Sequence, residues 1–105
     1  MKIKIKDTDY ELKLSMRSYM LMENIKGESF NIENMTDTII FFYCVILTST
    51  KEYDFKYDEL LDMLDENPGL LSEFNNWLLG EFQKESMMSP RDSEEDSKKK
   101  VNQDQ

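Results

Sequence analysis

The acidic side chains of Asp58, Asp62 and Glu66 have a spacing that could support chemistry, because they fall on successive turns of a predicted helix. Carboxylates on one helix face are able to hold a hard cation or to work as an acid and base pair. Leucines occupy the opposite face of this segment, a pattern typical of a solvated helix surface. The ligand spacing of a calcium loop is missing. We therefore interpret these acids as solvated and predict no metal site.

The residues that most catalytic sites require are absent or lie in apolar surroundings. The chain has no histidine, which removes Ser-His, Cys-His and His-metal sites. Its one cysteine, Cys44, excludes an intrachain disulfide and favours a reducing compartment. Because Cys44 lies between Tyr43 and Val45, it is interpreted as a small core residue. No glycine-rich phosphate loop is present. The sequence predicts a protein that is not an enzyme, with no catalytic, cofactor-binding or metal residue.

Charge is concentrated in the second half of the chain. The net charge is -9, and residues 52–85 hold ten acids and two bases, a balance of -8. An acidic surface disfavours phosphate backbones and anionic membranes, which attract clustered Lys and Arg. We therefore expect no nucleic-acid partner and no membrane partner. The alternative is that the acids imitate nucleic acid and so inhibit an enzyme.

A run of nine apolar residues at positions 39–47 is the most hydrophobic part of the chain. As a helix it would be about 14 Å long, against roughly 30 Å for a bilayer core, so it is too short to span a membrane. We predict a central buried helix that is capped by Thr36 or Asp37 and runs through Thr48. Its β-branched and aromatic residues would also suit a buried strand, but the cap and the length favour a helix.

The N-terminal residues alternate between polar and apolar types. This pattern predicts a β-hairpin with Ile3 and Ile5 on one face, a polar turn at residues 7–9, and Tyr10 and Leu12 on the returning strand. Lysines that alternate with isoleucines do not form the leader of a secretory signal, so no signal peptide is expected.

Signals for three further helices flank the apolar run. Ser15 is placed to cap a helix that ends near Gly27, a common helix terminator. Two amphipathic helices, with Pro68 between them, follow after residue 56. From Ser86 the apolar pattern ends, which predicts a flexible charged tail. The predicted fold is mainly α with an N-terminal β-hairpin (α+β), divided into a domain at 1–85 and a tail at 86–105.

Methionine is unusually frequent, with eight residues. Met16 and Met20 share a helical stripe with Tyr19, and we interpret these two methionines as flexible core fillers. Met22 lies off that stripe and is predicted to be exposed. Exposed methionine suits surfaces that accommodate varied apolar partners.

Three segments together resemble the small tail assembly chaperones of long-tailed bacteriophages. They are "KIKIKDTDYELKLSMRSYMLMENIKGESF", "TDTIIFFYCVILTS" and "DELLDMLDENPGLLSEFNNWL", and the resemblance covers about residues 2–82. It implies a chaperone that covers the apolar tape measure protein in the host cytoplasm and is absent from the mature virion. It also implies a longer product, made by ribosomal frameshifting near Lys98–Lys100, that recruits the tail tube protein.

The resemblance carries over no catalytic residue and no fixed partner motif. Candidate partner-binding residues are therefore chosen by expected exposure, and they are Tyr19, Met22, Trp77 and Phe82. Self-association into a homo-oligomer is left open. Two other functions are weighed: an acidic inhibitor that imitates nucleic acid, and a small metal-dependent enzyme.

Overall fold

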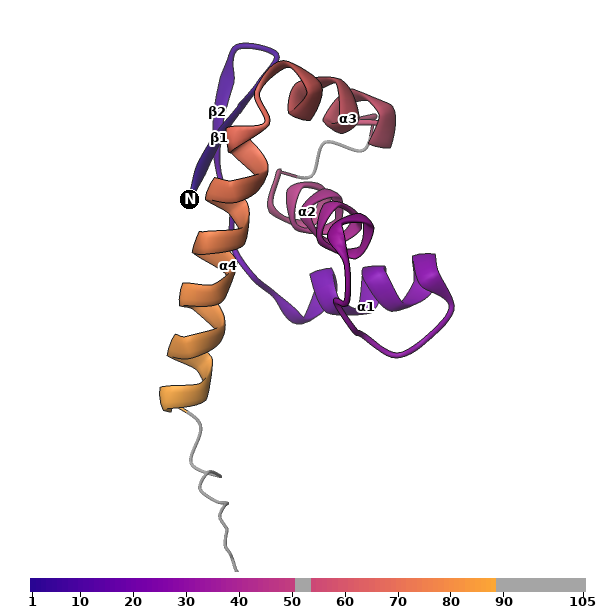
Figure 1. The fold of residues 1–105 in the computed structure, drawn as a ribbon, viewed down its shortest axis with the longest axis vertical. Helices are drawn as coiled ribbons and strands as arrows, with labels where there is room; N and C mark the ends of the chain where they lie inside the picture. Colours follow the sequence, from indigo (N-terminus) through magenta and orange to yellow (C-terminus); the bar gives the residue numbers. More distant parts are fainter. Residues whose placement is uncertain (51–53, 89–105) are drawn as a thin grey trace, which may run out of the picture. The chain divides into compact units, whose positions relative to one another are not determined.

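The computed structural model describes residues 1–50 and 54–88, with side chains as far as residue 84. The chain forms two compact units, Met1–Asn75 and Asn76–Gln105. A β-hairpin and helices make up the described residues (Figure 1), with these bounds: β1 Lys2–Ile5, β2 Thr8–Glu11, α1 Met16–Lys26, α2 Met35–Thr50, α3 Tyr57–Glu66 and α4 Gly69–Met88. The predicted fold class, mainly α with an N-terminal hairpin, is confirmed.

The hairpin turns earlier than the sequence pattern predicted. Lys6 and Asp7 both have positive φ angles, 52° and 66°, and Ile5 pairs with Thr8 across the two strands. A two-residue turn of this kind matches the twist of antiparallel strands. Thr8 and Asp9 therefore belong to β2, and their assignment to the turn was wrong. Ile3 and Ile5 are buried on one face, as predicted.

Helix α1 begins and ends where the sequence predicted. The Ser15 hydroxyl accepts a hydrogen bond from the Ser18 amide at 3.3 Å, and the Ser18 hydroxyl accepts one from the Ser15 amide. Gly27 ends the helix with a φ of 73°, a left-handed conformation that glycine adopts without steric cost. Caps of this type depend only on neighbouring residues, which is why the sequence located both ends.

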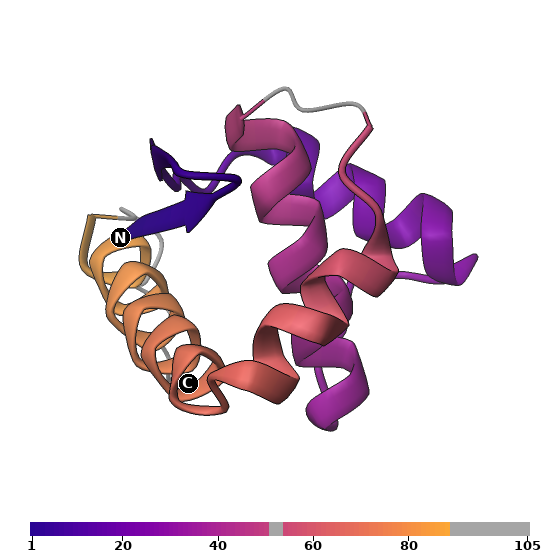
Figure 2. The same cartoon turned by 90° about the horizontal axis from the view of Figure 1, so that it is seen from above.

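The apolar run forms helix α2, so the alternative of a strand is excluded. Its cap is Asn34, whose Oδ1 accepts a hydrogen bond from the Asp37 amide at 2.9 Å. The prediction that Thr36 or Asp37 is the cap was wrong, because the helix already begins at Met35. Helix α2 lies between α1 and α3 (Figures 1 and 2). It is the central buried element that the sequence predicted.

Aromatic rings join α2 to its neighbours in the first unit. The Phe42 ring stacks on Phe74 at 4.1 Å between centroids, with an angle of 4° between the planes. The ring centroid of Phe41 is 5.5 Å from that of Tyr19 and 5.0 Å from that of Phe30. Each edge-on or stacked ring pair stabilises the fold by about 0.5–1.5 kcal/mol, in addition to the stabilisation that comes from burying its apolar surface. This cluster holds α1, α2 and the first turns of α4 together.

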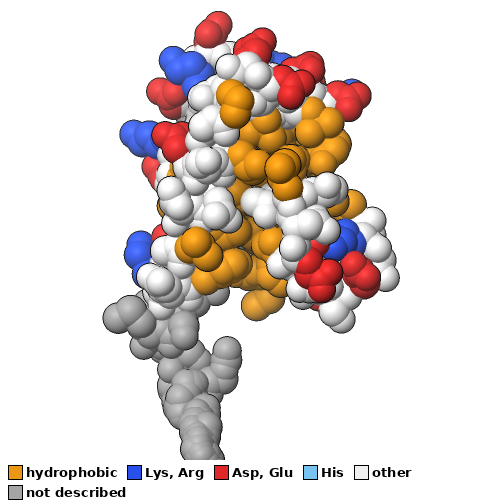
Figure 3. Space-filling model, in the orientation of Figure 1, with side chains coloured by type: hydrophobic (Ala, Val, Ile, Leu, Met, Phe, Trp, Pro, Cys, Tyr) orange, Lys and Arg blue, Asp and Glu red, His pale blue; other side chains and the backbone are white. Residues whose placement is uncertain are grey.

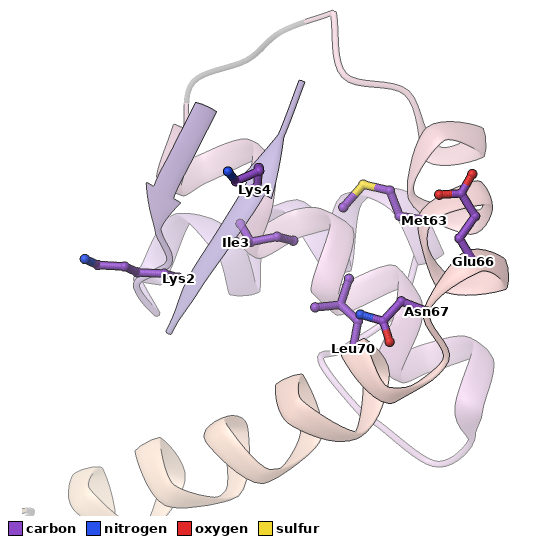
Figure 4. Close-up of a pocket in the computed structure, with 7 residues that line it drawn as sticks. All are labelled: Lys2, Ile3, Lys4, Met63, Glu66, Asn67 and Leu70. Atoms are coloured by element: carbon purple, nitrogen blue, oxygen red, sulfur yellow. The ribbon is translucent and has the colours of Figure 1, made fainter. Parts of the chain in front are cut away.

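The hairpin packs through its inward isoleucines. In Figure 4, Ile3 points from β1 toward Met63 of α3 and Leu70 of α4, and Lys2 points away from them. A cavity of about 300 Å³ lies among these side chains. Helix α3 ends at Glu66 and α4 begins just after Pro68, as predicted. Helix α4 continues to Met88 and thus includes residues 86–88, where the tail was predicted to begin. The rest of that tail, with Lys98–Lys100, lies outside the described residues.

Candidate functional site

Helix α2 is almost fully covered in its middle and only partly covered over its first turns. Phe41, Phe42 and Val45 have no exposed surface. At the start of the helix Met35 is 68 % exposed, and Ile39 and Ile40 are half-buried. A helix that is apolar all round is normally covered all round. The partly uncovered face of α2, which is made by Met35, Ile39 and Ile40, is therefore the candidate functional site.

Two grooves follow this face. The first, called the Met35 groove, has a volume of about 400 Å³ and is lined by residues of α2, α3 and the start of α4: Met35, Ile39, Leu61, Leu64, Asp65, Pro68, Leu71 and Ser72. The second, called the Ile25 groove, has a volume of about 360 Å³ and is lined by Ile25, Thr36, Ile40, Tyr43 and Tyr57. The two grooves are lined by neighbouring residues of α2, because Ile39 lines the first and Ile40 lines the second.

The chemistry of both grooves is that of an apolar binding surface. The Ile25 groove has no charged residue in its lining, and the Met35 groove has one, Asp65. Figure 3 shows hydrophobic side chains gathered over the α2 and α3 part of the visible face, with acidic side chains above them. Apolar surface rimmed by polar residues commonly marks a site of protein contact. The arrangement can bind apolar side chains.

Two tyrosines fix the wall of the Ile25 groove. The Tyr43 hydroxyl donates a hydrogen bond to the Phe55 carbonyl at 2.8 Å, and its ring meets Tyr57 edge-on at 5.5 Å. Burial raises the pKa of Tyr57, and burial with smaller contributions from Cys44 and Glu59 raises the pKa of Tyr43. Both hydroxyls therefore stay protonated at neutral pH.

A partly buried ion pair joins the end of α1 to the start of α2 beside this groove. The Lys26 ammonium donates to Oδ1 of Asp37 at 2.6 Å, and the Glu33 amide donates to Oδ2 at 2.9 Å. The hydrogen bond from Lys26 and then that from Glu33 lower the pKa of Asp37, and the bond to Asp37 raises the pKa of Lys26. Lys26 follows Ile25 in the chain, so the pair links the α1 end of the Ile25 groove to α2.

We expect Asp37→Asn to lower the thermal midpoint at pH 7 by about 5 °C, the usual effect of losing one charged hydrogen bond in a small domain. Asp37 has a folded pKa below its ordinary value of 3.8, so its contribution is complete above that pH and is lost as the pH falls through the folded pKa. Circular dichroism melts from pH 2 to 8 should therefore show the two proteins converging in acid. A constant difference down to pH 2 would contradict this account.

The residues first considered for chemistry are placed as the sequence predicted. Cys44 is fully buried, and burial raises the pKa of its thiol to about 12, so almost no thiolate exists at neutral pH. Asp58, Asp62 and Glu66 are exposed on α3. Among the residues that the structure describes, no group of three or more acidic or cysteine side chains is arranged to hold a metal ion.

The candidate partner-binding residues have different surroundings. Met22 has no exposed surface, so its predicted exposure was wrong: α1 turns Ser18 and Met22 inward and leaves Met16 and Met20 72 % and 56 % exposed. The interpretation of those two methionines as core was wrong for the same reason. Tyr19 is half-buried against Phe30 and Phe41. Trp77 and Phe82 are half-buried on α4 in the second unit. The four residues are thus divided between the two units.

Sequence reasoning missed the residues that line the two grooves. Met35, Ile39 and Ile40 were assigned to a connector or to a buried run, and Leu61 to a buried stripe. One signal was available: a run with no polar position at all has more apolar surface than one packing interface covers.

A scan against protein-family models, a search of curated proteins and a search of solved structures each gave no match. No helix within residues 1–50 and 54–88 is long and apolar enough to cross a membrane.

Proposed function

We propose that this chain is a tail assembly chaperone of a long-tailed bacteriophage, which acts without catalysis in the host cytoplasm. It covers apolar helical segments of the tape measure protein until the tail tube forms, and it leaves before the virion is complete. In a longer, frameshifted form it recruits the tail tube protein. The proposal joins the sequence resemblance to the uncovered apolar face of α2.

The partly uncovered face of α2 is the observation that carries the proposal. Met35 and Ile39 are four residues apart, so they form an apolar stripe just over one helical turn long, and Ile40 lies beside it in the Ile25 groove. Side chains at this spacing suit an amphipathic helix laid in a groove, whose anchors recur every three or four residues. The net charge of -9 would keep such a complex dispersed.

The rival function is an acidic inhibitor that imitates nucleic acid. Asp58, Asp62 and Glu66 are exposed on α3, which such an inhibitor requires. An inhibitor of this type acts through its carboxylates and has no use for an apolar groove on α2. The grooves therefore favour the chaperone.

Co-expression with the tape measure protein encoded in the same genome tests the proposal. Met35 and Met16 form a matched pair, because each is the first residue of a helix and their exposed fractions are 68 % and 72 %. Met35 lines the Met35 groove, and Met16 lines neither of the two grooves described above. Aspartate is favourable in the first turn of a helix, so both variants should fold. We expect Met35→Asp to reduce the soluble, co-purified tape measure protein at least tenfold, and Met16→Asp to leave it unchanged.

Two results would count against the chaperone. Equal losses from both variants would show that the Met35 groove is not the contact, and no solubilisation by the wild-type chain would reject the function itself. Inhibition of a host nuclease or polymerase that disappears when Asp58, Asp62 and Glu66 become amides would instead support the rival.

A further inference from the structure

The Met35 groove combines an apolar floor with an acidic edge. Asp65 lines the groove, and Asp58 lies two turns earlier on the same side of α3, next to Leu61 on the helix surface. Both carboxylates are exposed. In the part of the chain that the structure describes, neither of them forms an ion pair. The acidic edge therefore keeps its charge available to whatever lies over the groove.

From this we infer that the segment that docks in the Met35 groove is a basic amphipathic helix, whose lysines or arginines face Asp58 and Asp65. The inference rests on the proposed function and names the chemistry of the partner segment. Seven residues separate the two acids, which is about 10.5 Å along α3. A partner helix that runs beside α3 would meet both acids with basic residues about seven positions apart, and would place apolar residues between them on the groove floor.

Charge also argues against a second copy of this chain as the occupant. The chain carries a net charge of -9, so two copies repel each other. Helices α2 and α3 contain no Lys or Arg, and α1 and α4 contain few. A basic partner gains attraction from the acidic edge, and this attraction weakens with salt because the Debye length is about 8 Å at physiological ionic strength.

Three synthetic helical peptides provide the probes. They share one stripe of leucines spaced every three or four residues and differ only at two flanking positions, seven residues apart, which are Lys, Gln or Glu. Binding to the full chain is measured by isothermal titration calorimetry at 50 and 500 mM NaCl. We expect the Lys peptide to bind at least tenfold more tightly than the Gln peptide at 50 mM, with most of this preference lost at 500 mM. The Glu peptide should bind most weakly.

Two double variants test which acidic residues cause the preference for the Lys peptide over the Gln peptide. Asp58→Asn with Asp65→Asn should abolish the preference for the Lys peptide and leave the affinity for the Gln peptide unchanged. Asp7→Asn with Asp9→Asn changes the net charge by the same amount in the hairpin, and it should keep most of the preference. Equal effects of the two double variants would overturn the inference in favour of a general charge effect.

The remaining outcomes separate this inference from the proposed function. If the Lys and Gln peptides bind equally well and Met35→Asp abolishes both, apolar docking stands and the basic partner is rejected. If no peptide binds, the inference is rejected, and the co-expression experiment decides the chaperone role by itself. A dimer in sedimentation that Met35→Asp dissociates would make a second copy the occupant and would also overturn the inference.

Discussion

Replacing Phe42 with aspartate is expected to unfold the first unit of the protein. The Phe42 side chain has no exposed surface, and its ring is stacked on Phe74 with centroids 4.1 Å apart. Removing a buried Phe side chain costs about 3–5 kcal/mol, and a buried carboxylate without a partner costs more. Domains are stable by only about 5–15 kcal/mol, so the sum removes most or all of the stability.

Urea denaturation followed by circular dichroism measures this effect. Phe42→Ala should remain folded enough to titrate and should lose about 3–5 kcal/mol. Val45→Asp, one turn further along the same buried face, should unfold the protein as Phe42→Asp does. A Phe42→Asp protein with a native unfolding midpoint would mean that this face of α2 is not the core.

The second large effect is expected from Met22→Asp, because Met22 is fully buried on the inner face of α1. Replacing a buried methionine by a small side chain costs about 2–5 kcal/mol, and the aspartate charge adds a desolvation cost. The sequence pattern predicted the opposite, an exposed Met22 that binds a partner, and on that prediction the substitution would spare folding and weaken partner binding. Thermal melts should show a transition that is lost or lowered by more than 10 °C, as expected for a loss of this size in a small domain.

Met20→Asp is the matched control on the same helix. Met20 is 56 % exposed, and exposed substitutions usually change stability by less than about 0.5 kcal/mol. Its transition should therefore stay close to that of the wild type. If Met20→Asp were the damaging variant and Met22→Asp the harmless one, α1 would have to be rotated about its axis from the orientation described here.

These variants distinguish residues that stabilise the core from residues that line the Met35 groove. Phe42 and Met22 belong to the core, and changing them should remove binding only because the protein unfolds. Met35 belongs to the groove, and Met35→Asp should remove binding from a folded protein. A complete set of melts for the variants must accompany every binding experiment, since a loss of binding without a loss of stability is the result that identifies a contact surface.

The elements that could be predicted from the sequence are those whose signals are local. Helix α1 begins after Ser15 and ends at Gly27, and Pro68 separates α3 from α4. The alternation of polar and apolar residues places Ile3 and Ile5 on one face of β1. Each signal acts over four residues or fewer, through a cap, a fixed φ angle or a two-residue period. The buried position of Cys44 and the exposed acids of α3 were predicted for the same reason.

Which apolar surfaces are covered could be seen only in the folded protein. The inward face of α1 contains a polar residue, Ser18, so the apolar pattern did not identify this face as the buried one. Met16 and Met20, which were predicted to be core, are exposed, and Met22 is buried. At residues 39–47 of α2 every position is apolar, and periodicity cannot distinguish the positions that pack from those that remain open. That choice depends on the packing of residues distant in sequence, Phe74 against Phe42 and Tyr57 against Tyr43. The grooves exist because the packing contacts bury the middle of α2 and leave Met35 and Ile39, in its first turns, only partly covered.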